Sequence, residues 1–245
     1  MQDKIKIAAV SYLNAKPLLF AFEGGALKNQ IELTIDYPSK IAEQLIKKEV
    51  DIALVPVAVI PKLKEYYIIS DYCIATEGEV ASVCLFSEVP IDQIETILLD
   101  YQSQTSVALL KILLREHWKI TPVLQSSEIG YEASIKNNVA GLVIGDRALM
   151  QRNKSNYTYD LGLAWKEMTG MPFVFAVWVS NKKITDDFIK KFNQTTGEGL
   201  NNLDTILSGI VFPHYDMQYY YTENINFLLD SKKQESLKMF LAMIK

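Results

Sequence analysis

The chain has 245 residues, of which 49% are hydrophobic and 22% are charged, a composition typical of a folded globular protein. Its 25 lysines and arginines are outnumbered by 29 aspartates and glutamates, so the net charge of -4 argues against the basic surface that nucleic-acid binding requires. The two cysteines, Cys73 and Cys84, are too few for a disulfide framework and lack the spacing of metal ligands, so we expect no metal site.

Strand-like and helix-like segments alternate from the beginning of the chain. Ile5–Val10 is rich in β-branched residues and predicts a strand, an apolar helix follows near Pro17, and Ile31–Tyr37 alternates apolar and polar residues as a strand does. Ser39 is expected to cap the next helix, and Asp51–Pro56 predicts a buried strand that stops at a proline. These βαβ units predict a mostly parallel sheet with helices on both faces.

The middle of the chain repeats this alternation, and the last third is more helical. In chain order, the expected elements are the strand Thr96–Asp100, the helix Thr105–His117, the strand Thr121–Gln125, the short helix Glu132–Asn138, the strand Ala140–Ile144 and the helices Thr185–Asn193 and Ser231–Lys245. The pattern predicts a second α/β unit inside the first.

Two near-continuous apolar strands, Ala81–Phe86 and Phe173–Val179, bracket the middle segment. A segment bracketed in this way is expected to form an inserted lobe, with the two strands as hinges. The sequence therefore predicts an α/β fold of two lobes, the first made of residues 1–87 and 178–245 and the second of residues 88–177. The ligand cleft is expected between the lobes, at the carboxyl ends of the strands.

No segment predicts a targeting signal or a membrane span. The N-terminal segment lacks the long apolar region of a secretory signal. The longest apolar stretches, Ile52–Ile60 and Met171–Val179, have about half of the ~20 residues that a membrane helix needs. We therefore expect a cytoplasmic protein that binds neither membranes nor nucleic acids. The sequence carries no signal that defines an oligomeric state.

Six strings of residues carry a resemblance to a known family. In chain order they are Ser11–Leu18 (SYLNAKPL), Asp51–Pro56 (DIALVP), Ser82–Ser87 (SVCLFS), Leu99–Ser106 (LDYQSQTS), Leu142–Leu149 (LVIGDRAL), and Tyr159–Gly162 continuing to Thr169–Ala176. In this order and spacing they closely resemble the chorismate dehydratases of the futalosine route to menaquinone. The matches extend from Ser11 to Trp178, and the C-terminal quarter contributes little.

The resemblance implies the type II periplasmic-binding-protein fold and a reaction without a cofactor. The reaction removes water from chorismate, a small dicarboxylate, to give 3-[(1-carboxyvinyl)oxy]benzoate. In this family the favoured base is the substrate's own enolpyruvyl carboxylate, held in place by Asn and Ser side chains. Asn14 and Ser82 are the matching residues in this chain.

The residues by themselves suggest a different base. Asp146, Asp100 and Glu79 are the candidate side chains, because neither histidine of the chain falls in one of the six strings. Asp146 is preferred among them from the residues alone. Beside the resemblance it takes second place, as a catalytic or orienting group next to Gly145.

A doubly negative substrate ordinarily calls for arginine or lysine, yet the six strings contain few of either. Backbone N–H groups at helix N-termini, with hydroxyl and amide donors, offer an alternative. Ser103–Ser106 stands between a strand and a helix, where Ser103 also suits an N-cap, and Ser11–Asn14 follows the first strand. The expected substrate-binding residues are Ser11, Tyr12, Pro56, Ser103, Gln104, Thr105, Ser106, Gly145 and Phe173. Tyr219–Tyr221 is interpreted as a half-buried surface cluster.

Three alternative functions share this fold class. The sister family, 1,4-dihydroxy-6-naphthoate synthase, has a Ser-Pro-Cys-Pro-Asn type string after the first strand and a catalytic histidine where this chain has Gly145, so it is disfavoured. A non-catalytic solute-binding protein of a transporter would carry a leader sequence. A ligand-sensing regulatory domain would carry a helix-turn-helix before the first lobe. Neither feature is expected here.

Overall fold

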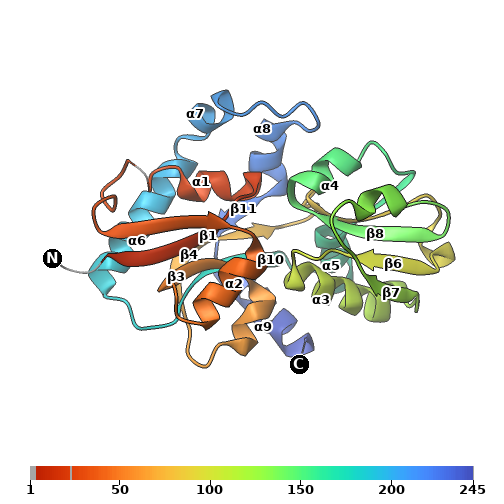
Figure 1. The fold of residues 1–245 in the computed structure, drawn as a ribbon, viewed down its shortest axis with the longest axis horizontal. Coiled ribbons are helices and arrows are strands. Elements are labelled where there is room, and N and C mark those ends of the chain that lie inside the picture. The colour runs from red at the N-terminus through yellow and green to blue at the C-terminus, as the bar shows by residue number, and fades with distance from the viewer. Residues whose placement is uncertain (1–3, 23, 245) are drawn as a thin grey trace.

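The computed structural model describes residues 4–22 and 24–244, and its strands form two sheets that lie side by side (Figure 1). In the order in which they pair, the strands of the first sheet are β11 (Asn226–Leu228), β4 (Tyr67–Thr76), β10 (Phe173–Ser180), β3 (Ile52–Pro56), β1 (Ile5–Val10) and β2 (Ile31–Asp36). Those of the second sheet are β7 (Val123–Ser126), β6 (Thr96–Leu99), β8 (Val139–Ile144), β5 (Val83–Ser87) and β9 (Tyr157–Asp160).

Each sheet combines a parallel group of three strands with antiparallel neighbours. β1 runs parallel to β2 and β3, and β6 runs parallel to β7 and β8. β10 lies antiparallel between β3 and β4, and β5 lies antiparallel between β8 and β9. The two-lobed α/β architecture expected from the sequence is therefore confirmed.

Nine α-helices lie among the residues that the structure describes. They are α1 (Lys16–Leu19), α2 (Pro38–Ile46), α3 (Gln104–Leu113), α4 (Gly145–Gln151), α5 (Leu161–Thr169), α6 (Asp186–Leu200), α7 (Leu203–Ser208), α8 (Met217–Tyr219) and α9 (Ser231–Met243). Over the described residues, no helix is long and apolar enough to cross a membrane.

Of two N-cap residues expected from the sequence, one caps its helix and the other does not. Ser103 caps α3 as predicted, because its side chain accepts a hydrogen bond from the Ser106 N–H. Ser39 does not cap α2, because that helix begins one residue earlier at Pro38, with Tyr37 as its N-cap residue. Proline suits the first helical position since it has no N–H to satisfy there.

The core is continuous through the central strands. Every residue of β3 and β10 is buried, as expected for central strands covered on both faces. Near the junction of the sheets, Trp165 of α5 packs edge-to-face against Phe173 of β10 and Phe240 of α9. The C-terminal helix is thus part of the core where the two sheets meet.

The chain crosses between the sheets twice, through residues 77–82 and through residues 170–172. The expected boundaries at residues 87 and 178 differ from this, because β5 pairs only within the second sheet and β10 only within the first. A continuous apolar strand signals burial on both faces, and it does not by itself signal a crossing. We therefore propose that the lobes divide at the two crossing segments.

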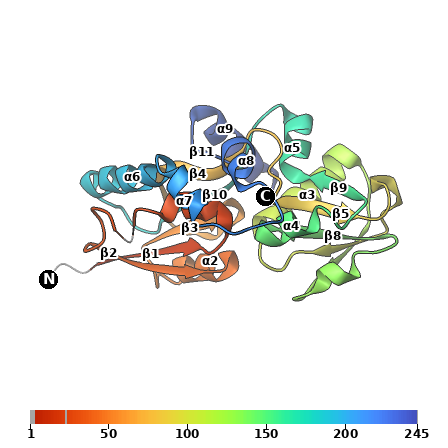
Figure 2. The ribbon, with the colours of Figure 1, turned by 90° about the horizontal axis from the view of Figure 1, so that it is seen from above.

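Helix α9 is fastened to both crossing segments, and Figures 1 and 2 both place it at the junction of the sheets. The buried Lys233 ammonium lies 2.8 Å from the Glu77 carboxylate at the start of the first crossing. Ser236 donates a hydrogen bond to the Pro172 carbonyl in the second crossing, and the Trp165 indole N–H lies 3.1 Å from both Ser236 Oγ and that carbonyl. One helix therefore restrains both connections.

Candidate active site

A cavity lies where the two sheets meet, and the ends of several strands form its walls. Val10 at the end of β1, Pro56 at the end of β3 and Ile144 at the end of β8 all line it. The carboxyl ends of parallel strands from both sheets thus face the same space, which is where open α/β sheets bind ligands. The remaining lining residues are Tyr12, Asn14, Pro38, Ile74, Val80, Ser82, Val83, Ser103, Ser106, Gly145, Phe175 and Ala176.

Seven of the twelve residues predicted from the sequence line this cavity. They are Tyr12, Asn14, Pro56, Ser82, Ser103, Ser106 and Gly145. They come from segments far apart in the chain, and the fold brings them together because each follows or precedes a strand at the junction of the sheets.

The other five residues lie elsewhere. Ser11 is exposed, and Phe173 is buried against Trp165 and Phe240, so that Phe175 reaches the cavity instead. The remaining three accept hydrogen bonds from other groups of the protein. Gln104 accepts from the Lys62 ammonium, Thr105 accepts from the Ala58 N–H, and Asp146 accepts from the Leu13 N–H.

Asn14, Ser82 and Tyr220 form an uncharged group of contacts at the cavity, which we call the neutral cluster. The Tyr220 hydroxyl donates a hydrogen bond of 2.7 Å to Ser82 Oγ, and both side chains are buried. The Asn14 side chain lies close enough to the Tyr220 hydroxyl to act on its pKa, which it lowers. The Asn14 Oδ1 atom is buried and has no hydrogen-bond partner among the described residues, which is rare for a buried acceptor and marks a place for a ligand donor.

Tyr220 was not found from the sequence. The cluster Tyr219–Tyr221 is not a half-buried surface group as expected: Tyr220 and Tyr221 are buried, and only Tyr219 is exposed. The Tyr221 hydroxyl donates to the Leu13 carbonyl, next to Asn14. Both tyrosines sit at a π-helical turn, Tyr220–Asn224, which turns their rings inward. A π-helical turn inside a helix is often found at a functional site, but the sequence gives no sign of it.

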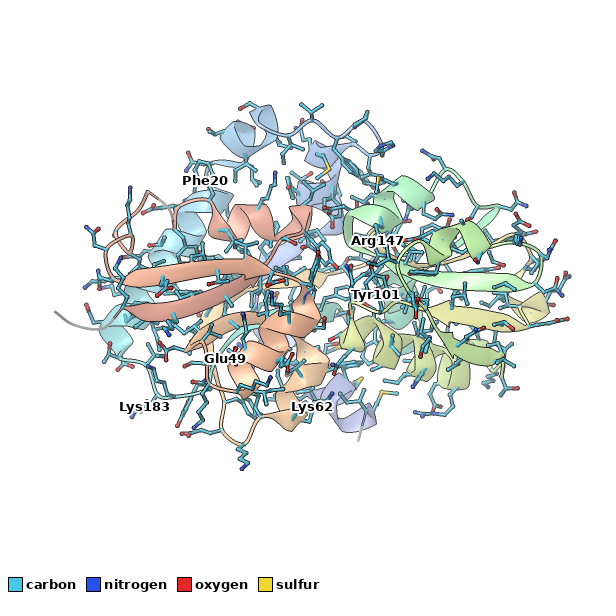
Figure 3. The ribbon with its side chains drawn as sticks, viewed as in Figure 1. Phe20, Glu49, Lys62, Tyr101, Arg147 and Lys183 are labelled. Carbon is cyan, nitrogen blue, oxygen red and sulfur yellow. The ribbon has the colours of Figure 1, made fainter. Side chains whose placement is uncertain are left out.

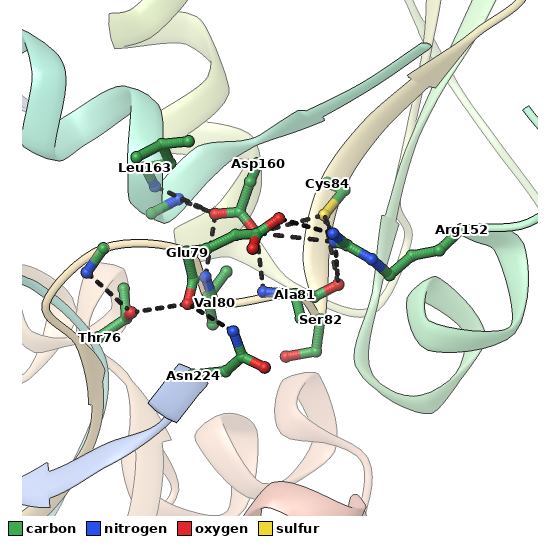
Figure 4. Close-up of polar contacts among 12 residues, drawn as sticks. Thr76, Glu79, Val80, Ala81, Ser82, Cys84, Arg152, Asp160, Leu163 and Asn224 are labelled. Carbon is green, nitrogen blue, oxygen red and sulfur yellow. Dashed lines mark hydrogen bonds and ion pairs between the residues drawn. The ribbon is translucent and has the colours of Figure 1, made fainter. Parts of the chain in front are cut away.

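Ser82 is presented by a strained loop that a buried carboxylate holds in place (Figure 4). Ala81, directly before it, has a φ of 60°, which is unfavourable for a residue with a side chain. Asp160 accepts hydrogen bonds from the N–H groups of Val80 and Ala81 at 3.0 and 2.7 Å. The same carboxylate caps α5 through the Gly162 and Leu163 N–H groups. Asp160 thus fixes the backbone from which Ser82 extends.

Gly145 is required by its backbone and by its neighbour. Its φ of 62° lies in the left-handed region, and a Cβ at this position would lie 3.1 Å from the Tyr12 ring. Its N–H donates a hydrogen bond of 2.7 Å to the Ser82 carbonyl. A side chain such as imidazole would be strained at this φ and would require the Tyr12 ring to shift, which agrees with the glycine that separates this chain from the sister family.

A second polar group near the cavity is charged, and we call Asp100, Glu132 and Arg147 the ion-paired cluster. The Arg147 guanidinium lies 2.7 Å from Asp100 Oδ2 and 2.6 Å from Glu132 Oε1. Asp100 also accepts hydrogen bonds from the Tyr131 hydroxyl and the Gln102 N–H, each at 2.8 Å. Figure 3 labels Arg147 on the side of the second sheet that faces the first. The charges of this cluster are satisfied internally.

The three carboxylates considered as bases do not line the cavity. Asp100 belongs to the ion-paired cluster, and Glu79 lies 2.6 Å from the Arg152 guanidinium. Burial raises the pKa of Asp146, while the Leu13 N–H and Lys16 act to lower it. Its Oδ1 accepts from the Leu13 N–H at 3.1 Å, so it orients the turn that carries Asn14. None of the three carboxylates is therefore among the residues that line the cavity.

The cavity suits an anion in spite of its composition. Over the described part of the chain, the lining residues include no lysine, arginine or histidine. Three helices begin at this space: α2 at Pro38, α3 after Ser103 and α4 at Gly145. Helix N-termini carry partial positive charge and N–H groups without a helical partner, which bind anionic oxygens. Within residues 4–22 and 24–244, no group of three or more acidic, histidine or cysteine side chains is arranged to hold a metal ion.

Comparison with known proteins gives both sequence relatives and structural neighbours. A family model described as menaquinone biosynthesis matches residues 5–245. The chorismate dehydratase of Thermus thermophilus is 28% identical over an alignment of 227 positions that covers 83% of each chain. That of Campylobacter jejuni is 25% identical over an alignment of 257 positions, gaps included, that covers 96% of each chain. A solved structure from Archaeoglobus fulgidus superposes with a TM-score of 0.73 at 14% identity, covering 98% of this chain and 96% of the other.

A further solved structure identifies the fold. The periplasmic aliphatic sulphonate-binding protein of Escherichia coli superposes with a TM-score of 0.64 at 11% identity, over 99% of this chain and 88% of the other. At this identity the likeness concerns the fold alone, and it confirms the periplasmic-binding-protein architecture.

Proposed function

The chain belongs to the menaquinone-biosynthesis family, and we propose that it is a chorismate dehydratase, a hydro-lyase that converts chorismate to 3-[(1-carboxyvinyl)oxy]benzoate. One observation carries the proposal to the level of residues. Asn14 and Ser82, which lie 68 positions apart in the sequence, meet the same buried hydroxyl at one cavity, and a buried Asn14 oxygen there lacks a partner.

Neutral donors bind the two carboxylates of chorismate in this proposal. The N-termini of α2, α3 and α4 supply N–H groups, and Ser82 supplies a hydroxyl donor. Ser103 and Ser106 hydrogen-bond each other at 3.0 Å, so this pair supplies one further hydroxyl hydrogen. The unpartnered Asn14 Oδ1 requires a donor, and the C4 hydroxyl is the group of the chorismate dianion that can provide one. The apolar walls exclude water, which strengthens each of these contacts.

The substrate's own enolpyruvyl carboxylate acts as the base. It takes the proton from C3, the electron pair of that C–H bond forms the C3–C4 double bond, and the hydroxyl at C4 leaves with a proton as water. The ring becomes aromatic, so the protein needs only to position the substrate and to keep water out. The engagement of Asp100, Glu79 and Asp146 elsewhere supports this assignment. No cofactor enters the reaction.

Substrate entry requires the two lobes to separate. The cavity has a volume of about 50 Å³, well below the several hundred Å³ typical of a small-molecule site. Hydrogen bonds join the two halves across it: Tyr12 to Gln102, Leu13 to Asp146, Ala58 to Thr105 and Lys62 to Gln104. We take the structure to represent a closed form, which opens at the two crossing segments to admit chorismate.

The protein is expected to work in the cytoplasm, in the futalosine route to menaquinone. The sister synthase is disfavoured because this chain has Gly145, in a backbone conformation that strains other residues, where that family has a histidine. A solute-binding protein remains the alternative that the fold permits, because the structural neighbour from Escherichia coli is of that class.

Incubation of the purified protein with chorismate tests the proposal. We expect a new aromatic absorbance and a product with the mass of chorismate less one water, without added metal or cofactor. Treatment with a chelator should leave the rate unchanged. Binding of chorismate without turnover would favour a solute-binding protein, and neither binding nor turnover would refute the proposal.

A further inference from the structure

We propose that Tyr220 is a positioning residue that orients the Ser82 hydroxyl so that its hydrogen points into the cavity, toward a carboxylate oxygen of the substrate. The inference rests on the proposed function, because it assigns a task within that site. It concerns a residue of the C-terminal quarter, which adds little to the resemblance to known dehydratases.

The argument begins with the direction of the hydrogen bond between the two hydroxyls. The Tyr220 hydroxyl donates to Ser82 Oγ at 2.7 Å, and 138 positions of sequence separate them. A serine hydroxyl has one hydrogen and can accept two hydrogen bonds. Because Ser82 accepts from Tyr220, its own hydrogen stays available. Among the described residues, Ser82 Oγ donates to no other group, and it lines the cavity.

The surroundings of Tyr220 favour that direction. Its side chain is buried, and burial raises the pKa of the hydroxyl well above its usual range, so the phenol keeps its proton at neutral pH. The Asn14 side chain lies near the same hydroxyl and acts to lower its pKa, which is the effect of a donor near the phenol oxygen, while the hydroxyl itself donates to Ser82. Hydrogen bonds arranged in such a chain polarise one another, which makes Ser82 a better donor.

Asn14 lies near the same hydroxyl. Its Oδ1 is buried at the cavity and has no partner among the described residues. A serine hydrogen and an amide oxygen beside this phenol are therefore left for the substrate. Tyr221, its neighbour, has a different task, because its hydroxyl donates to the backbone carbonyl of Leu13.

Tyr220→Phe removes this hydroxyl and keeps the buried ring. We expect kcat to fall about 10- to 100-fold, with KM changed less than about 3-fold, because an ionic hydrogen bond to the substrate loses its alignment. Tyr215→Phe is the matched control: its ring lies 6.1 Å from that of Tyr220, and its hydroxyl contacts Asn224 outside the cavity lining. This control should stay within about 2-fold of wild-type activity.

A double-mutant cycle separates positioning from general support of the fold. If Tyr220 acts through Ser82, Tyr220→Phe should cost less than about 3-fold in activity when Ser82 is already alanine. Losses that multiply would overturn the proposal, as would a Tyr220→Phe enzyme that keeps the full wild-type kcat. Failure of the wild-type protein to dehydrate chorismate would instead refute the proposed function, and that result is seen before any variant is made.

A second substitution covers the case in which Tyr220→Phe does not fold. Incorporation of 3,5-difluorotyrosine at position 220 keeps the hydroxyl and makes it a stronger donor. We expect kcat to change at least about 2-fold with the fluorinated residue at position 220, and the same residue at position 215 to have no effect. An unchanged kcat in the folded, fluorinated protein would overturn the assignment.

Discussion

The neutral cluster and the ion-paired cluster lie on either side of the junction between the sheets, and they treat buried polar atoms in opposite ways. In the ion-paired cluster, Asp100 accepts hydrogen bonds from Arg147, Tyr131 and the Gln102 N–H, so the carboxylate is surrounded by donors of the protein itself. In the neutral cluster, Asn14 Oδ1 has no partner among the described residues.

The difference follows from the cost of burying each kind of group. A buried charge without a partner costs far more than an uncharged polar group, so the protein must pair it permanently. A buried neutral amide without a hydrogen-bond partner costs about 1–3 kcal/mol, and a bound substrate that supplies the partner removes this cost. We therefore propose that the charged residues near the cavity stabilise the fold and that uncharged residues recognise the anionic substrate.

The largest expected effect comes from removing Asn14. Asn14→Ala should lower kcat about 10²- to 10³-fold, because the substrate loses a positioned amide at the reacting centre. The melting temperature should change little, since Asn14 Oδ1 contributes no hydrogen bond to the fold. Steady-state kinetics with chorismate and thermal denaturation would check both halves. An unchanged rate would remove Asn14 from the site.

Breaking the ion-paired cluster should lower the stability of the fold strongly and kcat only weakly, the reverse of Asn14→Ala. Arg147→Met leaves the fully buried Asp100 carboxylate without its cation and should lower the free energy of unfolding by about 3 kcal/mol or more. Urea denaturation measures this loss, and kcat of the folded variant should fall far less than in Asn14→Ala. The control is Arg115→Met, an exposed arginine paired with Glu116, which should change stability by less than about 0.5 kcal/mol. Equal losses in the two variants would contradict the comparison.

The buried carboxylate behind Ser82 offers a test by pH. Burial raises the pKa of Asp160 to about 6, with Glu79 acting in the same direction and the backbone N–H groups in the other. Between about pH 4 and pH 6 the folded protein therefore keeps a proton that the unfolded chain releases, and stability from this group is lost as pH rises through about 6. Arg152 and Cys84 also face this carboxylate.

Comparison with Asp160→Asn isolates that contribution. From pH 7 to pH 4, wild type should gain about 2–3 kcal/mol of unfolding free energy relative to the variant, measured by urea denaturation at each pH. A difference between the two proteins that does not depend on pH would show that Asp160 does not titrate in this range.

The smallest effect is expected from Asp146→Asn. The amide oxygen of asparagine can still accept from the Leu13 N–H, and the carboxylate lies outside the cavity lining. We expect activity within about 5-fold of wild type, in agreement with a substrate carboxylate as base. A loss of several orders of magnitude would make Asp146 the base and would extend the catalytic role to a charged side chain.

Local patterns predicted most of the strands, although β4, β9 and β11 were not expected from the sequence. The β-branched run Ile5–Val10 is β1, and the Ser103 cap lies at the start of α3 as expected. Asn14 and Ser82 line one cavity, as the resemblance implied. These features depend on residues near one another in the chain or on whole strings of them, which is why a single sequence contains them.

What the sequence could not predict depends on distant contacts. The Tyr220 hydroxyl donates to Ser82 across 138 positions of sequence. The carboxylate of Asp160 accepts from the Val80 and Ala81 N–H groups across 80 and 79 positions. Three consecutive tyrosines have no periodicity that tells which rings turn inward. The lobe boundaries depend on distant contacts as well, because the pairing partners of β5 and β10 decide the sheet to which each strand belongs, and those partners lie far away in the chain.

The distribution of the strands along the chain has a consequence for synthesis on the ribosome. All five strands of the second sheet lie between Val83 and Asp160, so that sheet can assemble as soon as this stretch has emerged. The first sheet must wait for β10, which stands between β3 and β4, and for β11 at its edge. The half of the protein whose translation begins first is therefore the half that completes its folding last.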